Sequence, residues 1–479
     1  MALRLNRDEY RDKVYGCWLG KSIGGTLGGP FEGRREILDV TGYTTPAGEP
    51  LPNDDLDLQL IWLKAVQDRG PRAITNQLLG EYWLNYIPPF WNEYGVCKAN
   101  MRVGLLPPLS GEYENAKWKH SNGAWIRSEI WACLAPGCPD LALRYAYADA
   151  SVDHGGGEGT YAEMFTAALE SAAFVMSDRE ELLELALSKI PYDCRVARSI
   201  GIARDAYAQG VTWQEARNRV VEDSADLGWF QAPANVAFVV IGWLYGEGDF
   251  GKSLLIAVNC GDDTDCTGAT LGSILGILYG KKNIPQEWTE PIGERILTIA
   301  IDRGSWWGIP KTLNDLTDMV LQQTPQSLTI CGKDVALTDG PTKVDDDHRR
   351  WMADPQAAQQ IWEKSPYAVE FDFVHTRVIV DYQREPKVKA GESFPVKVTL
   401  VNQVPSCQHA EISWHLPEGW QILPATRRHV SLRHHPPVET VTVELLPNAL
   451  PTASVRGTLE VSVQGRPTIG LIPLVFLAE

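Results

Sequence analysis

The sequence predicts a large all-α domain followed by an antiparallel β-sandwich, because the spacing of its apolar residues changes once along the chain. Up to about residue 325, apolar residues recur every three or four positions, as on one face of a helix. After Pro366 they alternate with polar residues, as in strands that bury one face. A chain of 479 residues is also too long for one ordinary core. We therefore expect a helical domain at 1–325, a connector at 326–365 and a sandwich at 366–479.

Helices are predicted throughout the first part of the chain. The segment DDLDLQLIWLKAVQDRG (54–70) puts three leucines on one helix face, and Gly70 with Pro71 ends it. Residues 139–177 are predicted to form two alanine-rich helices separated by the glycines at 155–157. No strands alternate with these segments, so a parallel sheet is not expected here. Further helices are expected near residues 180–190, 195–209, 212–223, 234–245, 267–280 and 311–323.

Short strands are predicted over the last 110 or so residues. In SFPVKVTLVNQ (393–403) three apolar side chains alternate with Lys397 and Thr399, and GTLEVSVQG (457–465) alternates in the same way. Pro, Gly and Asn turns separate these runs, as in an antiparallel sandwich. The pattern resembles that of immunoglobulin-like accessory modules.

Charge and cysteine usage exclude several classes of partner and location. The formal net charge is -17 and the pI is about 5.1, which argues against nucleic-acid backbones and anionic membranes as partners. No apolar run reaches the roughly 18 residues that a membrane span needs. The first 20 residues carry charges throughout, unlike a signal peptide. Nine scattered cysteines match no zinc pattern, so we expect a cytoplasmic protein with reduced thiols.

Two clusters of carboxylates stand where helices are expected to begin, GDDTD (261–265) and NDDLD (53–57). Helix capping is one explanation, since Asp is favoured at the N-cap and in the first turn. A cap needs only one carboxylate, however, and each cluster offers adjacent acids with an oxygen-bearing neighbour, Asn53 or Thr264. Together the clusters would supply hard oxygen ligands for Mg²⁺, or for two ions about 3.5–4 Å apart. Small residues behind Asp265 would let that helix approach its neighbours and bring the clusters together: Gly268, Ala269, Gly272 and Gly276.

Four ordered stretches stand out between about residues 10 and 320. They are GCWLGKSIGGTLGGPFEG (16–33), which contains Glu32, NDD (53–55), the segment from Asn122 to His154, and GDDTDCTGATLGSILG (261–276). In this order they resemble the ADP-ribosylglycohydrolase family, whose Glu in the first stretch corresponds to Glu32. The resemblance implies an all-α hydrolase with a binuclear Mg²⁺ site that holds the ribose beside the anomeric carbon. The implied metal positions are Asp54, Asp55, Asp263 and Asp265, with Asn53 and Cys266 beside them.

The resemblance also suggests roles in catalysis and substrate binding. Cleavage of a ribosyl bond develops oxocarbenium-like charge and needs a positioned water, and we expect Glu32 or Asp55 to be the base that activates it. His154 is either a structural histidine or, with the glycines that follow it, a contact to ribose or phosphate. The expected substrate-binding residues are Asn122, Gly123, His154, Gly155 and Gly156.

The sequence departs from the family pattern at several positions. A metal-binding Thr of the family is Cys266 here, and a thiol is a soft ligand poorly suited to Mg²⁺. The second ion is therefore expected to be weaker, absent, or completed by Thr267 or water. Other departures are Asn53 for Thr, Gly25 for Asp and Asp153 for Thr. The dense aromatic residues between 82 and 131 are expected to serve mainly the core and contacts in a homo-oligomer, with one or two rings stacking on a base or aglycone.

Three functions therefore compete. The first is Mg²⁺-dependent removal of ADP-ribose from a modified protein or small molecule. The second is hydrolysis of a smaller N-ribosyl compound, such as a nucleoside, on the same framework. The third is a non-catalytic metal-binding structural protein, against which the presence of Glu32 and all four aspartates argues.

Overall fold

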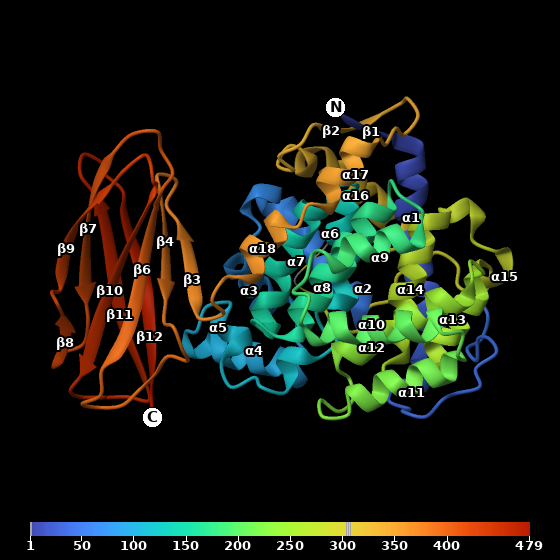
Figure 1. Cartoon of the computed structure of the whole chain (residues 1–479), viewed down its shortest axis with the longest axis horizontal. Helices are drawn as coiled ribbons and strands as arrows, with labels where there is room; N and C mark the ends of the chain where they lie inside the picture. Colours follow the sequence, from blue (N-terminus) through green and yellow to red (C-terminus); the bar gives the residue numbers. More distant parts are fainter. Residues whose placement is uncertain (1, 303, 305, 307) are drawn as a thin grey trace. The chain divides into compact units, whose positions relative to one another are not determined.

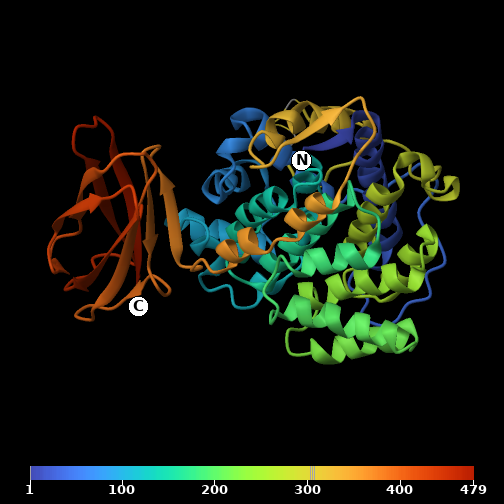
Figure 2. The same ribbon diagram turned by 45° about the horizontal axis from the view of Figure 1, so that its top comes forward.

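The computed structural model describes residues 2–302, 304, 306 and 308–479, and it contains two compact units (Figure 1). The first unit comprises the chain up to residue 98 together with residues 114–363. The second comprises residues 99–113 and 364–479. Figure 2 shows the same elements after a 45° turn.

The first unit is helical, which confirms the all-α prediction. Within the described residues, no helix is both long and apolar enough to cross a bilayer. Its helices are α1 (Arg7–Gly28), α2 (Asp54–Arg69), α3 (Asn76–Tyr86), α4 (Asn92–Val103), which runs on into the residues of the second unit, α6 (Glu129–Leu134), α7 (Pro139–His154), α8 (Glu158–Ala173), α9 (Arg179–Leu187), α10 (Arg195–Ala208), α11 (Trp213–Asp223), α12 (Ala232–Gly246), α13 (Phe250–Asn259), α14 (Thr264–Tyr279), α15 (Gln286–Thr289), α16 (Leu313–Leu328), α17 (Asp346–Ala353) and α18 (Gln356–Trp362).

Most predicted helices lie within a few residues of their expected positions. The difference that matters most is at α14, which begins at Thr264 rather than 267, so Asp265 and Cys266 lie in its first turn. Helix α13 was not predicted. It begins where the Asp249 side chain accepts the backbone N–H of Lys252, which satisfies one of the donors that a helix start leaves unpaired.

Helices α1 and α14 pack backbone against backbone. Three glycines of α1 face three of α14, and an added Cβ at Gly16, Gly20 or Gly24 would overlap a carbonyl oxygen of the other helix. The facing residues of α14 are Gly276, Gly272 and Gly268. This confirms the prediction that small residues behind Asp265 allow a close approach. The packing fixes the start of α14 beside the end of α1, and hence beside Glu32.

The second unit contains two five-stranded sheets, with strand orders β3-β4-β6-β10-β8 and β5-β12-β11-β7-β9. All described pairs within them are antiparallel except β5 with β12. The strands are β3 (Ala368–Asp372), β4 (Thr376–Asp381), β5 (Lys387–Val388), β6 (Phe394–Asn402), β7 (Gln408–His415), β8 (Trp420–Leu423), β9 (Arg427–Leu432), β10 (Val438–Pro447), β11 (Ser454–Val463) and β12 (Ile469–Ala478).

Both sheets contribute to one apolar core, which confirms an antiparallel β-sandwich. Val396 and Val398 of β6 lie opposite Val443 and Val441 of β10, and all four are buried. The alternation seen in the sequence therefore separates an inner face from an outer one. The immunoglobulin-like character of the sandwich stays a prediction.

The units divide the chain differently from the expected boundaries at 325 and 365. Strand β2 (Val335–Thr338) pairs in parallel with β1 (Leu3–Asn6), so residues after 325 continue the helical unit. Residues 99–113 join the sandwich because Leu105 and Leu109 are buried in its core. A long-range pairing and a distant apolar contact explain both differences, and neither has a local sequence signal.

Candidate active site

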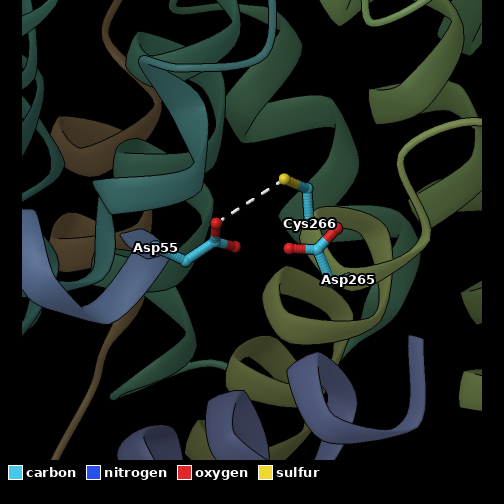
Figure 3. Close-up of side chains that lie close together, drawn as sticks. All are labelled: Asp55, Asp265 and Cys266. Carbon is cyan, nitrogen blue, oxygen red and sulfur yellow. Dashed lines mark hydrogen bonds between the residues drawn. The ribbon is translucent and has the colours of Figure 1, made fainter. Parts of the chain in front are cut away.

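Two helix starts and the end of a short turn bring five acids together in the helical unit. Asp54 and Asp55 open α2, Asp263 precedes α14, and Asp265 lies in its first turn. Glu32 follows the 3-10 turn (Gly29–Phe31) that continues α1. Figure 3 shows the carboxylates of Asp55 and Asp265 turned towards each other, with the Cys266 thiol beside them.

Four of these acids, together with Cys266, form two groups in each of which the candidate ligand atoms lie within 4.8 Å of one another, and Asp54 lies outside both groups. One group is Asp55, Asp265 and Cys266, and the other is Glu32, Asp263 and Asp265. Asp265 belongs to both, so its carboxylate could bridge two ions. The clusters that lie more than 200 residues apart in the sequence therefore meet, as the sequence predicted.

Several carboxylate oxygens in this cluster fit a cation because they lack a hydrogen-bond partner. Asp55 Oδ2, Asp263 Oδ1 and Asp265 Oδ1 are buried without one. Among the described residues the nearest cation is Lys21, whose Nζ lies 3.7 Å from Asp55 Oδ2 but only 2.8 Å from Glu129 Oε1. One shared ammonium cannot offset five acids, and buried charges without compensation are costly.

Burial, and after it mutual repulsion, raises the pKa values of these acids. Burial, followed by Asp265, raises the pKa of Asp54 to about 6. Glu32 is exposed as a residue, but desolvation of its carboxylate, followed by the charges of Asp265 and Asp54, raises its pKa to about 7. Burial raises the pKa values of Asp55 and Asp263 well above their usual range. A bound cation would favour the ionised forms and reverse these shifts.

Helix capping does not account for the cluster. Asp263 occupies the N-cap position of α14, but its side chain makes no capping hydrogen bond. At α2 the cap is Asn53, whose Oδ1 accepts the backbone N–H of Asp55 at 2.8 Å. The carboxylates of Asp54 and Asp55 are therefore free of that role. Asn53, expected among the metal positions, serves as the cap of α2, and a role as a metal ligand stays a prediction.

Cys266 lies in the cluster, as expected, and acts there as a donor. Its thiol donates to Asp55 Oδ1 over 3.5 Å (Figure 3). Burial and the neighbouring aspartates raise the pKa of the thiol well above its usual range, so it stays protonated. A protonated thiol is a poor ligand for a hard cation.

A cavity of about 250 Å³ opens beside the acids. Five of its lining residues are carboxylates, and none of the residues described around it is Lys, Arg or His. Asn122 and Gly123 line it, and Asn122 Nδ2 donates to Asp263 Oδ2 at 2.7 Å; their expected role in substrate binding stays a prediction. Tyr94 donates its hydroxyl to Asp54 Oδ2 at 3.1 Å. The lining acids are Glu32, Asp54, Glu93, Asp263 and Asp265.

His154, Gly155 and Gly156 do not line this cavity. His154 is fully buried, and its Nε2 lies 3.0 Å from the hydroxyl of Ser121, which does line the cavity. Its Nδ1 lies 3.0 Å from Asp153 Oδ1. The histidine therefore reaches the cavity through Ser121, and direct substrate contact by these three residues stays a prediction.

Arg127 is part of a second buried cluster with Asp149, Asp153 and Glu163. The guanidinium donates to Asp149 Oδ1 at 3.0 Å and to Asp153 Oδ1 at 2.8 Å, and all three side chains are fully buried. It also donates to the carbonyl of Gly123. Arg127 is thus structural and holds the segment that carries Asn122 and Gly123.

Several cavity residues were not singled out from the sequence. Glu93 and Ser121 have no motif of their own, and their proximity depends on how α4 packs. Among the aromatic residues, Trp83, Trp125 and Trp131 are buried in the core as expected. The rings that reach the cavity are Trp91, Tyr94, Trp118 and Phe230. The one sequence feature that could have indicated these cavity residues is Glu93, an acid that lies between Trp91 and Tyr94.

The sequence profile of the ADP-ribosylglycohydrolase family matches residues 6–329. ADP-ribosylarginine hydrolase Tri1 of Pseudomonas putida (strain GB-1) is 23% identical over 304 residues, which cover 61% of this chain and 77% of that protein. The protein of the same name from Serratia proteamaculans (strain 568) is 41% identical over 59 residues, 12% of this chain and 16% of its own length. One chain of a solved ADP-ribosylglycohydrolase-related protein complex is 22% identical to this protein. The match covers 67% of this chain and 99% of that chain, with a TM-score of 0.45.

Proposed function

The chain belongs to the ADP-ribosylglycohydrolase family and is a glycosidase, and on that premise we propose that it is an Mg²⁺-dependent hydrolase of ADP-ribosylated compounds. The bond cleaved would join the ribose anomeric carbon to nitrogen or oxygen of an acceptor, on a protein or a small molecule. The observation that carries the proposal is the meeting of two groups of candidate ligands, which share Asp265, at an open cavity.

Asp54, Asp55, Asp263 and Asp265 would hold the metal. Carboxylate oxygens are the ligands that Mg²⁺ prefers, and orphaned oxygens on three of these residues support the assignment. When bound, the cations supply positive charge that orients the ribose hydroxyls and acidifies water. Asn122 would keep one Asp263 oxygen in place and leave the other for the ion.

Glu32 is our choice for the base. It lines the cavity, whereas Asp55 is fully buried and does not. A carboxylate beside the anomeric carbon can take a proton from the attacking water and offset the oxocarbenium-like charge of the transition state. Asp55 would then serve as a ligand, held by Lys21 on one side and by the Cys266 thiol on the other.

Hydrolysis of a smaller N-ribosyl compound remains a second candidate, favoured by one observation. The cavity is acidic, and the residues described around it include no basic side chain to meet a pyrophosphate. An uncharged or cationic ribosyl compound would be repelled less than ADP-ribose. The third candidate, a non-catalytic homologue, is not supported by an open cavity beside five converging acids.

Metal-depleted protein incubated with ADP-ribosylated arginine and serine peptides and with ribonucleosides tests these candidates. We expect release of ADP-ribose that requires added Mg²⁺ and stops with excess chelator. Release of ribose alone would favour the second candidate. Release that is insensitive to chelation would contradict the metal site, and no release with Mg²⁺ from any compound would contradict the proposed function.

A further inference from the structure

A second cavity of about 170 Å³ lies in the helical unit, and among the described residues it shares no lining residue with the cavity beside the acids. The two cavities are neighbours, since consecutive residues line one each. Trp229 and Asp262 line the second cavity, whereas Phe230 and Asp263 line the first. The second cavity therefore lies behind one wall of the candidate active site, and the proposed mechanism does not use it.

Arg217 brings a buried positive charge to the second cavity. The residue is 8% exposed, and the described hydrogen-bond acceptors of its guanidinium are all uncharged oxygens. Its Nε donates to the carbonyl of Cys260 at 3.0 Å, and its Nη atoms donate to Asn218 Oδ1 and to the carbonyl of Arg35. A guanidinium has five N–H groups, so two remain for a ligand. Burial lowers the pKa of Arg217, and an anion bound beside it would favour the charged form.

Arg35 adds a second guanidinium to the same cavity. The residue is exposed, and its guanidinium carbon lies 4.0 Å from the centre of the Trp229 ring. Phe230 packs on this tryptophan with ring centroids 4.2 Å apart. In the described part of the chain, the Arg35 side chain donates no hydrogen bond. The tryptophan ring therefore orients the guanidinium and leaves its N–H groups for a ligand.

The charged groups around the second cavity leave one positive charge in excess. Asp262 is the one acid among the residues described there. Its carboxylate oxygens accept from neutral donors, the backbone N–H of Phe230 at 3.1 Å and Nδ2 of Asn235 at 3.2 Å. Two guanidinium groups and one carboxylate give a net charge of one, which a monoanion from outside the chain would offset.

The other walls of the second cavity are mostly apolar, and its size fits one ring. An apolar cavity of about 150 Å³ can hold benzene, so about 170 Å³ admits a ligand with a single ring. A planar carboxylate matches a guanidinium through two parallel N–H···O bonds. The cavity thus combines an anion site with room for one ring. Its apolar lining residues are Val221, Ala225, Ala234 and Phe238.

We propose that the second cavity binds a small aromatic monocarboxylate, whose carboxylate lies between Arg35 and Arg217 and whose ring packs against Phe238. The carboxylate would offset the excess positive charge of the cavity. The ring would cover apolar surface that otherwise faces water. This site goes beyond the proposed function, because neither its existence nor its test requires turnover.

Calorimetry with benzoate tests the site in the full-length protein. Wild-type protein should bind benzoate, and Arg35→Gln should bind it about ten- to a hundredfold more weakly, because one charged partner of the carboxylate is lost. Arg35 is exposed, so this change does not endanger folding. Ala225→Leu, at another exposed position, should also weaken binding because the larger side chain fills the cavity. A wild-type protein that does not bind benzoate, or an Arg35→Gln variant that binds it as tightly, would overturn the proposal.

Arg34→Gln is a matched control. Arg34 is exposed and adjacent to Arg35, but its guanidinium pairs with Glu36 and does not line the second cavity. Its replacement removes the same charge from the protein and should leave benzoate binding unchanged. Equal losses in Arg34→Gln and Arg35→Gln would show a general effect of net charge and would overturn the assigned site.

Three further titrations check the chemistry and the place of binding. Benzamide, which lacks the charge, and acetate, which lacks the ring, should each bind about tenfold more weakly than benzoate or worse. Inorganic phosphate that binds more tightly than benzoate would contradict the proposed ligand class. Excess chelator should leave benzoate binding unchanged, because none of the candidate metal ligands lines the second cavity. Benzoate binding that requires Mg²⁺ would place the ligand at the active site and overturn the proposal.

Discussion

The helical unit contains two clusters of acids, which differ in the cations beside them and in their pKa shifts. In the cluster around Arg127, the guanidinium bonds Asp149 and Asp153, and its charge helps lower the pKa of Asp153 to about 2. Burial still raises the pKa of Asp149 and Glu163, which are less completely paired. In the cavity cluster the pKa values of all five acids are raised, and the nearest cation in the described part of the chain is Lys21, at 3.7 Å from Asp55.

We interpret this difference as one between a structural cluster and a cluster that binds a ligand. In the structural cluster the chain itself supplies the guanidinium that pairs with Asp149 and Asp153. In the cavity cluster we propose that a bound cation supplies the compensating charge. The lowered pKa of Asp153, beside a guanidinium, contrasts with the raised pKa values of Asp54 and Asp263 at the cavity.

The largest expected difference between the clusters is catalytic. Glu32→Gln should lower kcat by about 10²–10⁴-fold with little change in stability, because it removes the proposed base at an exposed position. Glu36→Gln is the control, since Glu36 is exposed and pairs only with Arg34 among the described contacts. Steady-state release of ADP-ribose measures both. Full activity in Glu32→Gln would remove Glu32 as the base.

The structural cluster should respond in stability rather than activity. Arg127→Met leaves Asp149 and Asp153 buried without their cation, and breaking such a pair costs about 3–5 kcal/mol. Denaturant unfolding measures this loss. Adding Asp153→Asn to Arg127→Met should recover part of it, since one unpaired charge is then gone. A loss below about 1 kcal/mol would mean that Arg127 does not hold this cluster.

A change of pH should alter the contributions of the two clusters to the free energy of unfolding in opposite directions. The pKa of Asp153 is about 2 in the folded protein and about 3.9 in an unfolded chain, so its contribution is full above about pH 5 and is lost as pH falls towards 2. The contribution is about 2.6 kcal/mol. Unfolding free energies of wild type and Asp153→Asn should therefore converge between pH 5 and pH 2.5. A difference that stays constant over this range would contradict the assignment.

In metal-depleted protein, the contribution of Asp54 to stability should change with pH in the opposite direction to that of Asp153. Its pKa is raised from about 3.9 to about 6, so the folded state binds an extra proton between these values. Stability present below pH 4 is then lost as pH rises through 6. Unfolding of metal-depleted wild type and Asp54→Asn across pH 4 to 7 checks the sign. Saturating Mg²⁺ should abolish this pH dependence.

The smallest expected effect concerns Cys266. Cys266→Thr replaces a thiol that stays protonated with a hydroxyl, a harder oxygen donor, in the group with Asp55 and Asp265. Mg²⁺ affinity, measured by calorimetry, should rise several-fold. Unchanged or weaker affinity would show that position 266 is not a ligand.

The sequence was most informative where the cause of a structure is local. Helix periodicity located most helices, and the glycines of α14 correctly indicated a close approach to a neighbour. The two acidic stretches could be assigned to one site because a shared role explains both better than two caps do. The structure then showed which residue caps α2: Asn53 rather than an aspartate.

Long-range packing explains what the sequence left out. Glu93 faces the cavity only because α4 lies against Gly123, and no spacing between residues 93 and 123 encodes that contact. From the sequence, His154 was either a structural histidine or a substrate contact; in the structure its ring packs against Gly159 and is fully buried. Residues 99–113 join the sandwich through two leucines more than 250 residues away from it in the sequence.

The central claim is that the acids at the start of α14 hold a cation and do not cap a helix. The unfolding free energy of wild type and Asp265→Asn, each with and without Mg²⁺, tests it directly. Wild type should gain about 2.7 kcal/mol at an Mg²⁺ concentration of 100 times Kd, and the variant should lose most of that gain. Without metal the variant should be as stable as wild type or more so, because one repelling charge is gone. A variant that is destabilised by about 0.5–2 kcal/mol equally with and without Mg²⁺, as after loss of a helix cap, would contradict the claim.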